Sequence, residues 1–292
     1  MRRRDFLVSL AGASVAAAAG PKFTALAQQT GTPIVRKGRI KQGVTPGVFR
    51  GMAREDTFRE AARLGIKGYD LIAPPEWPLL RKYGLTPSMW NGPAGTIPNA
   101  LNRTENHAAI ETSLRAAIDQ CAAEKVPNII TFSGNRRGMD DRLGADNAVT
   151  FLNKIKAQAE DKGVTICIEL LNSKVNHADY MFDHIGWGVD VMKRVNSPRV
   201  KILYDIYHAQ IMDGDIVRTI KENIQWIGHF HTGGNPDRHD IDDTQELNYH
   251  AVMQAIADLG FTGFVSHEYS PWPGHDAIET LKKAIDICTV NG

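Results

Sequence analysis

Four side chains that could bind a metal ion each end a short, mostly apolar run of the sequence. They are Glu169, Asp205, His231 and Glu268, and the runs before them are rich in isoleucine, valine, tyrosine and phenylalanine. Runs of this length and composition are typical of β-strands. In an α/β barrel the carboxyl ends of the strands form one rim, where active sites are built. We therefore predict that the four side chains point at one centre and share a metal ion.

The donor atoms of this set are three carboxylates and one imidazole. Such hard-to-borderline donors suit one divalent ion, Mn²⁺ or Mg²⁺, and they are also compatible with Co²⁺ or Zn²⁺. Because no thiolate belongs to the set, a structural zinc site is not indicated. Taken singly, each acidic residue could instead cap a helix or be a solvated loop charge. Their common position at four successive strand ends favours the metal.

The elements that must position these residues alternate along the chain. Helical periodicity is clear around Ile110–Cys121, Met181–Met192 and Ile278–Cys288. Six β-rich runs are clear and two are weaker, the latter being Arg39–Thr45 and Leu85–Trp90. The clear runs are Gly68–Ile72, Asn128–Phe132, Val164–Leu171, Val200–Asp205, Gln225–His231 and Gly263–Glu268. Eight strands that alternate with helical segments predict a single-domain α/β fold, a (β/α)₈ TIM barrel.

Strand alternation extends the prediction to neighbouring residues. If the four candidate ligands point into the barrel, residues two positions earlier also point inward, one layer deeper. These deeper residues are Cys167, Leu203, His229 and Ser266. The intervening residues then face the helices, and among them His267 must find a polar partner beneath the helical layer.

The stretch from Trp226 to Tyr249 is the longest polar excursion of the chain. Its three histidines, His229, His231 and His239, could be interpreted as a metal cluster by themselves. Alternation instead makes His231 the only ligand among them, with His229 one layer deeper and His239 in the loop. Loops at strand ends carry function in many folds, so this loop is expected to help set specificity.

The first residues have the pattern of a targeting segment. Residues 1–27 combine an arginine-rich start, an Ala/Ser/Gly-rich stretch and Ala25-Leu26-Ala27, which predicts a signal peptide. The adjacent arginines before Asp5-Phe6-Leu7 resemble a twin-arginine signal, which predicts export to the periplasm. A disordered or membrane-anchoring helix is the alternative. Residues 28–37 are then a linker and 38–292 the barrel, with no membrane association after cleavage.

Composition excludes several classes of protein. A net charge of +1 with 23% charged residues gives no basic face for a nucleic acid. Three cysteines, Cys121, Cys167 and Cys288, cannot all pair, and no C-x-x-C motif is present, so they are interpreted as buried thiols. A small-molecule partner is expected, and a homo-oligomer is left open.

The candidate metal residues resemble those of a known superfamily. Glu169, the Asp205-x-x-His208 pair, the His-Phe-His ending at His231, and Glu268 are similar to the metal site of the xylose isomerase-like TIM barrels. Within it, the hydroxypyruvate isomerase family is the closer resemblance. Three segments carry that similarity: Pro236-Asp-Arg-His-Asp240, Gln245-Glu-Leu-Asn-Tyr249 and His267-Glu-Tyr-Ser-Pro271. Two positions differ, since this chain has His231 where that family usually has Gln and Asp70 where Glu is usual.

The resemblance implies a metal-dependent isomerase of a small hydroxy-keto acid or sugar, such as hydroxypyruvate, which is converted to tartronate semialdehyde. It implies that Glu169 and Glu268 are also the paired acid and base, which move a proton through an enediolate. His208 is expected to contact substrate or to make a structural hydrogen bond. Arg238 is expected to polarise a substrate hydroxyl or to bind its carboxylate.

Alternatives remain open at this point. Because His231 is the ligand type of the ketose 3-epimerases, a sugar 3-epimerase is the second candidate, and an exported sugar-binding barrel without turnover is a third. Endonuclease IV, another relative on this barrel, needs three metals and more ligand histidines than this chain offers. Four residues of the polar loop are expected to fix the loop or an interface: His239, Asp240, Glu246 and Asn248. Three others could wall the pocket or be structural: Trp90, Asn91 and His107.

Overall fold

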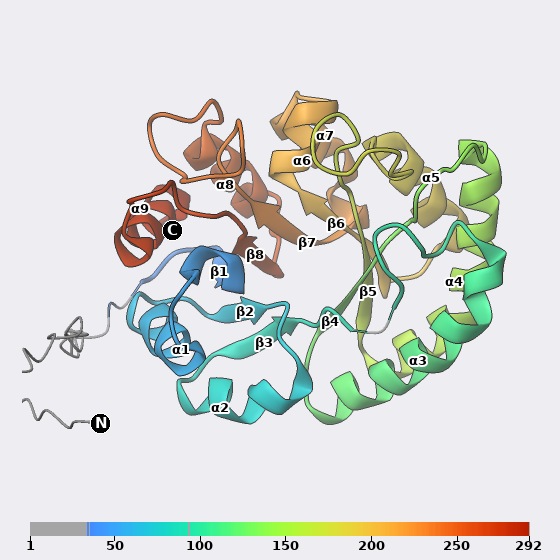
Figure 1. The fold of residues 1–292 in the computed structure, drawn as a ribbon, viewed down its shortest axis with the longest axis horizontal. Coiled ribbons are helices and arrows are strands. Elements are labelled where there is room, and N and C mark those ends of the chain that lie inside the picture. The colour runs from blue at the N-terminus through green and yellow to red at the C-terminus, as the bar shows by residue number, and fades with distance from the viewer. Residues whose placement is uncertain (1–33, 35, 93, 292) are drawn as a thin grey trace, which may run out of the picture. The chain divides into compact units, whose positions relative to one another are not determined.

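The computed structural model describes residues 34, 36–92 and 94–291, which form one barrel (Figure 1). Eight parallel strands make a single sheet in the order β3-β2-β1-β8-β7-β6-β5-β4. Their bounds are β1 Lys41–Val44, β2 Gly68–Asp70, β3 Thr86–Met89, β4 Asn128–Thr131, β5 Thr165–Glu169, β6 Val200–Asp205, β7 Ile227–Thr232 and β8 Phe264–His267. The prediction of a TIM barrel is therefore confirmed, and the two weaker strands are both present.

The sheet closes between β3 and β4 through one residue just beyond β3. Trp90 donates its backbone N–H to the Asn128 carbonyl at 3.0 Å and accepts from the N–H of Ile130 at 3.1 Å. This parallel bridge brings the first and last strands of the order together. Because the strands then surround a common axis, their carboxyl ends converge on one rim.

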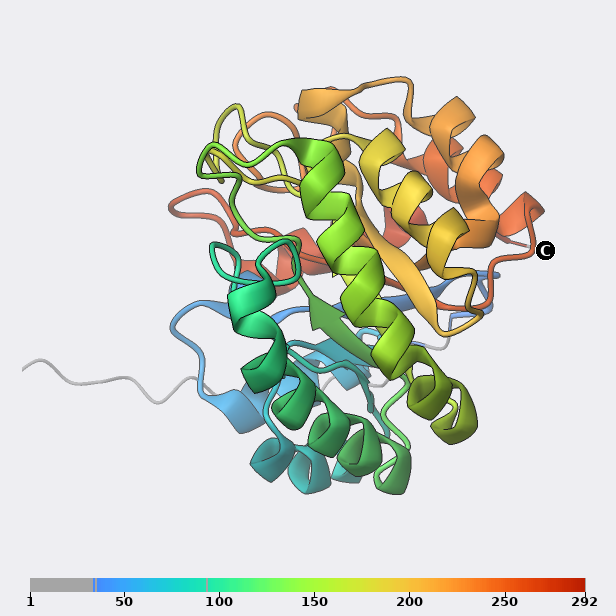
Figure 2. The same cartoon turned by 90° about the vertical axis from the view of Figure 1, so that its right-hand side faces the viewer.

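Helices and short 3₁₀ turns connect the strands and cover their outer faces. The helices are α1 Arg54–Arg63, α2 Trp77–Lys82, α3 Thr104–Ala123, α4 Asp141–Lys162, α5 Ile185–Val195, α6 Ile206–Met212, α7 Ile216–Asn223, α8 Tyr249–Asp258 and α9 Ala277–Cys288, and the 3₁₀ turns are η1 Pro46–Phe49, η2 Pro74–Glu76 and η3 Ile224–Trp226. Figure 2 shows the two longest, α3 and α4, packed side by side on the outside of the strands. None of the described helices is long and apolar enough to cross a membrane.

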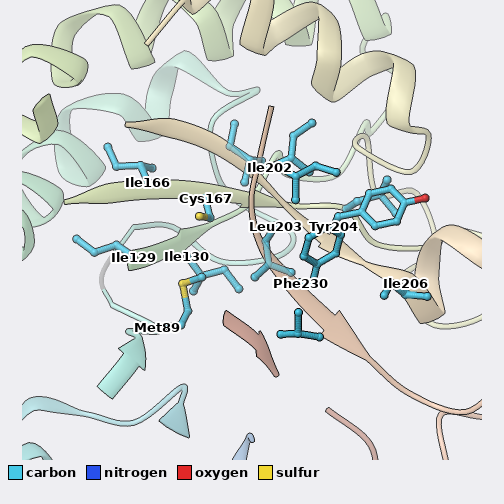
Figure 3. Packing of buried hydrophobic residues seen from close by; sticks show 14 of the residues in the cluster. Met89, Ile129, Ile130, Ile166, Cys167, Ile202, Leu203, Tyr204, Ile206 and Phe230 are labelled. Carbon is cyan, nitrogen blue, oxygen red and sulfur yellow. The ribbon is translucent and has the colours of Figure 1, made fainter. Parts of the chain in front are cut away.

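The core lies between the strands and the surrounding helices, where apolar residues of β3 to β7 pack together (Figure 3). Ile202, Tyr204 and Phe230 are fully buried, and the rings of the last two meet edge to face at 6.0 Å. Cys121, Cys167 and Cys288 are buried free thiols, as the sequence indicates.

Two details differ from the sequence pattern. The helix expected from Met181 begins only at Ile185, because Met181 lies in the loop before it and accepts a contact from Asn102. Ile34 and Arg36, expected in a linker, are hydrogen-bonded to the barrel through the carbonyls of Arg63 and Leu64. The predicted signal peptide lies outside the described residues.

Candidate metal centre

The four predicted ligands converge at the carboxyl ends of the strands. Glu169 ends β5, Asp205 ends β6, His231 lies near the end of β7, and Glu268 follows β8. One ligand atom from each lies within 4.8 Å of those of the others. His231 Nδ1 is 2.5 Å from a Glu268 oxygen and 3.3 Å from a Glu169 oxygen. Three of the four are buried, and the Glu268 side chain is 22% exposed.

This donor set fits a divalent cation. Three carboxylates aimed at one buried centre repel one another unless a positive charge lies between them. At Glu169, burial first and then the nearby carboxylates Glu268 and Asp205 raise the pKa to about 7, against the opposing effect of His231. Oxygen ligands with one imidazole are the donors that Mn²⁺ and Mg²⁺ accept, and Zn²⁺ and Co²⁺ tolerate.

Asp205 is held by the helix that follows it directly. It is the N-cap of α6, and its Oδ1 accepts a hydrogen bond from the backbone N–H of His208 at 3.2 Å. Capping therefore engages one carboxylate oxygen and leaves the other, Oδ2, facing the cluster. The N-cap interpretation and the ligand interpretation of this residue are both compatible with the geometry.

The orientation of His231 is set from the opposite side of its ring. Its Nε2 lies 3.1 Å from Oδ2 of Asp70, at the end of β2, and the same oxygen lies 2.7 Å from Nε2 of His229. Asp70 is fully buried and also accepts from the Ser88 hydroxyl. With Nε2–H donating to Asp70, Nδ1 is the nitrogen that faces the carboxylates, which is the arrangement of a carboxylate-oriented metal histidine.

The charges around His231 explain its protonation. Burial lowers the pKa of this imidazole, but Glu268, Asp70 and Glu169 outweigh that effect and raise the pKa well above the usual range. His231 in the metal-free protein is therefore an imidazolium that neutralises part of the acidic cluster. Asp70 was not predicted as a site residue, although the family resemblance had marked it as a position where Glu is usual.

Arg238 reaches into the same cluster from the loop after β7. Its Nη2 donates to Glu268 at 2.8 Å and to Asp205, and its Nε donates to the Glu268 carbonyl at 3.0 Å. Gly233 permits this approach, because a Cβ there would lie 2.9 Å from Cγ of Arg238 and 3.1 Å from that carbonyl. Against the cost of burial, Arg238 and His231 lower the pKa of the Glu268 carboxyl. In the metal-free protein the guanidinium is thus paired with two of the predicted ligands.

His208 presents one nitrogen without a hydrogen-bond partner. Its Nδ1 lies 2.6 Å from Nδ2 of Asn172, whose Oδ1 accepts from the backbone N–H groups of Val175 and Asn176. Because those two bonds fix the amide of Asn172, its NH₂ donates to Nδ1, and the hydrogen of His208 is on Nε2. Burial lowers the pKa of this histidine well below its usual range, which keeps the ring neutral. Nε2 is buried, has no hydrogen-bond partner among the described residues, and lies 3.9 Å from Asp205.

The outward-facing His267 has the polar partners that strand alternation required. Its Nδ1 lies 3.0 Å from the Thr232 hydroxyl and its Nε2 lies 2.9 Å from Oε1 of Gln42. Burial lowers its pKa to about 3, so the ring is neutral.

The remaining polar-loop residues make local contacts. His239 stacks on Trp272 with ring centroids 3.6 Å apart, and Asp240 pairs with His275. Asn248 caps α8, while the Glu246 side chain accepts a hydrogen bond from Gln210. Among the possible wall residues, His107 contacts the Leu101 carbonyl at 2.8 Å, and Trp90 closes the sheet. The residues that line the cavity over the metal centre include none of Trp90, Asn91 and His107.

A cavity of about 560 Å³ opens at the rim above the cluster. Its lining residues are Thr45, Pro46, Gly47, Arg50, Leu71, Asp237, Arg238, His239, Glu268, Tyr269 and Ser270. Glu268 and Arg238 belong both to this wall and to the cluster, so the cavity leads to the candidate metal centre. Leu71 directly follows Asp70 and has a φ of +58°, a strained conformation for a bulky residue of the kind found near functional sites. The volume suits a small organic ligand.

These features define a (β/α)₈ barrel with a carboxylate–imidazole centre on its catalytic rim. The family model of the xylose isomerase-like TIM barrel matches residues 58–288, and the chain belongs to that family.

Named relatives narrow the comparison. A Danio rerio protein whose provisional name is hydroxypyruvate isomerase is 31% identical over 138 residues, which cover 46% of this chain and 50% of that one. A 2-oxo-tetronate isomerase of Pectobacterium atrosepticum is 26% identical over 232 residues, covering 74% and 86%. The chain thus aligns with about half the length of the first relative and with most of the second. The prediction of a hydroxypyruvate isomerase-like chain agrees with these names.

A solved structure supports the fold over nearly the whole barrel. The crystal structure titled AP endonuclease, family 2, from Brucella melitensis superimposes with a TM-score of 0.75 at 26% identity and covers 84% of this chain and 96% of that one.

Proposed function

We propose that this protein is a metal-dependent isomerase of a small hydroxy-carbonyl compound, of the hydroxypyruvate or 2-oxo-tetronate isomerase type. The observation that carries the proposal is the convergence of Glu169, Asp205, His231 and Glu268 beside a cavity that Glu268 lines. The relatives' names support the reaction class. The four residues would hold one divalent ion, with Mn²⁺ or Mg²⁺ the best fit to the donors.

A divalent ion bound there would supply a Lewis acid that polarises a carbonyl oxygen. Glu169 and Glu268 come from β5 and β8, with two strands between them, so they approach the centre from different sides. Glu169 has the raised pKa of a group that can take a proton near neutral pH, and Glu268 has the lowered one. Two carboxyls with separated pKa values are the usual division between the acid and base roles.

In the proposed reaction the ionised Glu268 removes the proton from the carbon beside the carbonyl, which leaves an enediolate. Glu169, which can carry a proton near neutral pH, delivers it to the neighbouring carbon, and the hydroxyl proton passes to the former carbonyl oxygen. Glu268 then holds one proton more and Glu169 one fewer, and exchange with solvent restores both. His208 donates Nε2–H to a substrate oxygen, which is the partner that its buried nitrogen lacks. Arg238 keeps Glu268 ionised until substrate arrives.

Solvent deuterium tests the proposal. The full chain loaded with Mn²⁺ is incubated in deuterated water with hydroxypyruvate and with ketoses, and recovered compounds are examined by NMR and mass spectrometry. Deuterium at the neighbouring carbon is expected for the isomerase, while inversion at the same carbon would select a 3-epimerase. If no substrate exchanges deuterium, the isomerase proposal is contradicted and the alternative of a sugar-binding barrel without turnover is favoured.

Variants assign the two proton-transfer groups. Glu169→Gln and Glu268→Gln are each expected to lower turnover by about two to four orders of magnitude. Glu246→Gln, a loop carboxylate whose side chain contacts Gln210, is the matched control and is expected to retain the parent rate. Full activity in both the Glu169→Gln and the Glu268→Gln variants would contradict the assignment of these two residues as the proton-transfer groups.

We also propose that the protein is exported through the twin-arginine route and acts in the periplasm. The support is the sequence of residues 1–27. Replacing Arg3 and Arg4 together with lysine should retain the protein in the cytoplasmic fraction, and unchanged fractionation would contradict this.

A further inference from the structure

The wall of the cavity next to Glu268 comes from the segment that follows β1. Thr45, Pro46, Gly47 and Arg50 all line it. Val44 pairs with His267 in the sheet, and the N–H of Thr45 donates to the His267 carbonyl at 3.0 Å. Thr45 therefore stands beside Glu268 at the level of the candidate metal centre, although β1 itself contributes no carboxylate to it.

Thr45 carries a hydroxyl that nothing in the described chain uses. The residue is 1% exposed, and its Oγ1 has no hydrogen-bond partner among the described residues. Thr45 occupies the N-cap of η1, yet its side chain makes no capping bond. Buried hydroxyls are nearly always partnered, because desolvation without a partner is costly. An unpartnered hydroxyl that lines a cavity is a donor suited to a ligand oxygen.

Arg50 is the second unengaged group on this wall. It is exposed, and its side chain has neither an ion pair nor a hydrogen bond with any described residue. The other arginine of the cavity, Arg238, is already paired with Asp205 and Glu268, so it brings little net positive charge to the cavity. The guanidinium able to accept a new anionic partner is therefore that of Arg50. A planar guanidinium matches the two oxygens of a carboxylate.

We propose that Thr45 and Arg50 form an anion subsite that binds the carboxylate end of the substrate. Arg50 pairs with the carboxylate, and the Thr45 hydroxyl donates to an oxygen of the same ligand. The cavity then favours hydroxy-oxo acids over neutral ketoses of similar size. The role of this subsite in turnover rests on the proposed isomerase function. Its binding of an anion does not depend on that function.

Binding of D-glycerate and glycerol separates charge from size, since the two differ mainly in the carboxylate. Calorimetric titration of the full chain with Mn²⁺ is expected to show glycerate binding at least about tenfold tighter than glycerol. Arg50→Gln should weaken glycerate about tenfold and leave glycerol unchanged. Arg142→Gln, at an exposed arginine without an ion pair in the described chain and outside the cavity, is the control and should change neither.

Thr45 is tested by paired substitutions. Thr45→Val removes the hydroxyl with little change of shape and should weaken glycerate several-fold, whereas Thr45→Ser keeps the donor and should bind within about twofold of the parent. With hydroxypyruvate as substrate, Arg50→Gln is expected to raise KM about tenfold while kcat changes by less than about threefold, because the lost contact is made equally in the ground state and in the transition state.

The outcomes keep the two proposals apart. Unchanged glycerate affinity in the Arg50→Gln variant, or no preference of the parent for glycerate over glycerol, overturns the anion subsite whatever the activity. Loss of glycerate binding in the Arg50→Gln variant, together with no deuterium exchange in the parent, retains the subsite and overturns the isomerase.

Discussion

Asp70→Asn is expected to weaken Mn²⁺ binding although Asp70 is not itself one of the four proposed ligands. Asp70 Oδ2 accepts from Nε2 of both His231 and His229, at 3.1 and 2.7 Å. An asparagine keeps the shape, and its amide oxygen can still accept from both N–H groups, but it removes the negative charge that makes these bonds strong. The His231 ring is then held less firmly in the orientation that leaves Nδ1 facing Glu169 and Glu268.

The size of the effect follows from the burial of this network. Loss of such an outer partner of a metal histidine typically costs about 10- to 100-fold in metal affinity. At a fixed excess of Mn²⁺ this removes about 1.4–2.8 kcal/mol of metal-dependent stabilisation. Removing one partner of a buried charged pair also costs about 3–5 kcal/mol of the metal-free free energy of unfolding. Asp70, His229 and His231 are all fully buried, so screening by solvent does not reduce this cost in free energy.

Two measurements distinguish these contributions. Competition with a fluorescent chelator at a temperature well below the melting point gives the Mn²⁺ affinity, and denaturant unfolding of the chelator-treated protein gives the metal-free stability. Ser88→Ala is the control, because it removes the third hydrogen bond of Asp70 and leaves both histidine bonds in place. An Asp70→Asn variant that is folded and binds Mn²⁺ within about twofold of the parent would refute the positioning role.

Three further predictions follow from buried ionisable groups. His267 has a pKa of about 3 in the folded state against 6.5 normally, so the stability that its neutral form contributes is fully present above pH 6.5. As the pH falls from 6.5 toward 3, up to about 5 kcal/mol of that stability is lost, and His267→Gln should flatten this part of a pH-stability curve. Mn²⁺ binding at pH 7 should release about one proton or more, because the raised pKa of His231 leaves Nδ1 protonated until the ion binds; calorimetric enthalpies that are equal in buffers of different ionisation enthalpy would contradict this. Glu169→Gln should stabilise the metal-free protein at pH 8 by about 3 kcal/mol, because a folded-state pKa of about 7 against 4.5 means that ionisation destabilises the fold above pH 4.5. Chemical unfolding that shows a loss of stability would contradict this cost of the buried carboxylate.

The sequence was informative wherever local periodicity decides the outcome. Alternation at period two placed His267 on the helix side and required a polar partner, which the structure supplies in Thr232 and Gln42. The same rule predicted that His229 lies one layer below His231, and both rings contact Oδ2 of Asp70. Eight strand-like runs alternating with helical segments were enough for the barrel, because each run ends near the carboxyl end of a real strand.

Contacts between distant parts of the chain could not be predicted in this way. Asp70 meets His229 across 159 residues and Arg238 meets Asp205 across 33, and no periodicity relates such pairs. The helix expected from Met181 is present but begins four residues later, at Ile185, because Met181 is buried in the loop before it. The unpartnered hydroxyl of Thr45 is also invisible in sequence, because it depends on which partners are missing nearby.

The balance of charge at the rim argues for a ligand that completes it. Asp70, Glu169, Asp205 and Glu268 bring four carboxyls into a largely buried space, and Arg238 and a protonated His231 are the cations in contact with them. Burial, and to a smaller extent the neighbouring carboxylates, raise the pKa of Glu169 to about 7 although His231 acts against them. A barrel selected for stability alone would gain by replacing such a cluster with apolar residues, since buried ion networks seldom exceed hydrophobic packing in stability. An ion of charge +2 at the centre would displace the His231 proton and neutralise the three carboxyls that face it, Glu169, Asp205 and Glu268, so the cost of the cluster is best explained by the binding of that ion.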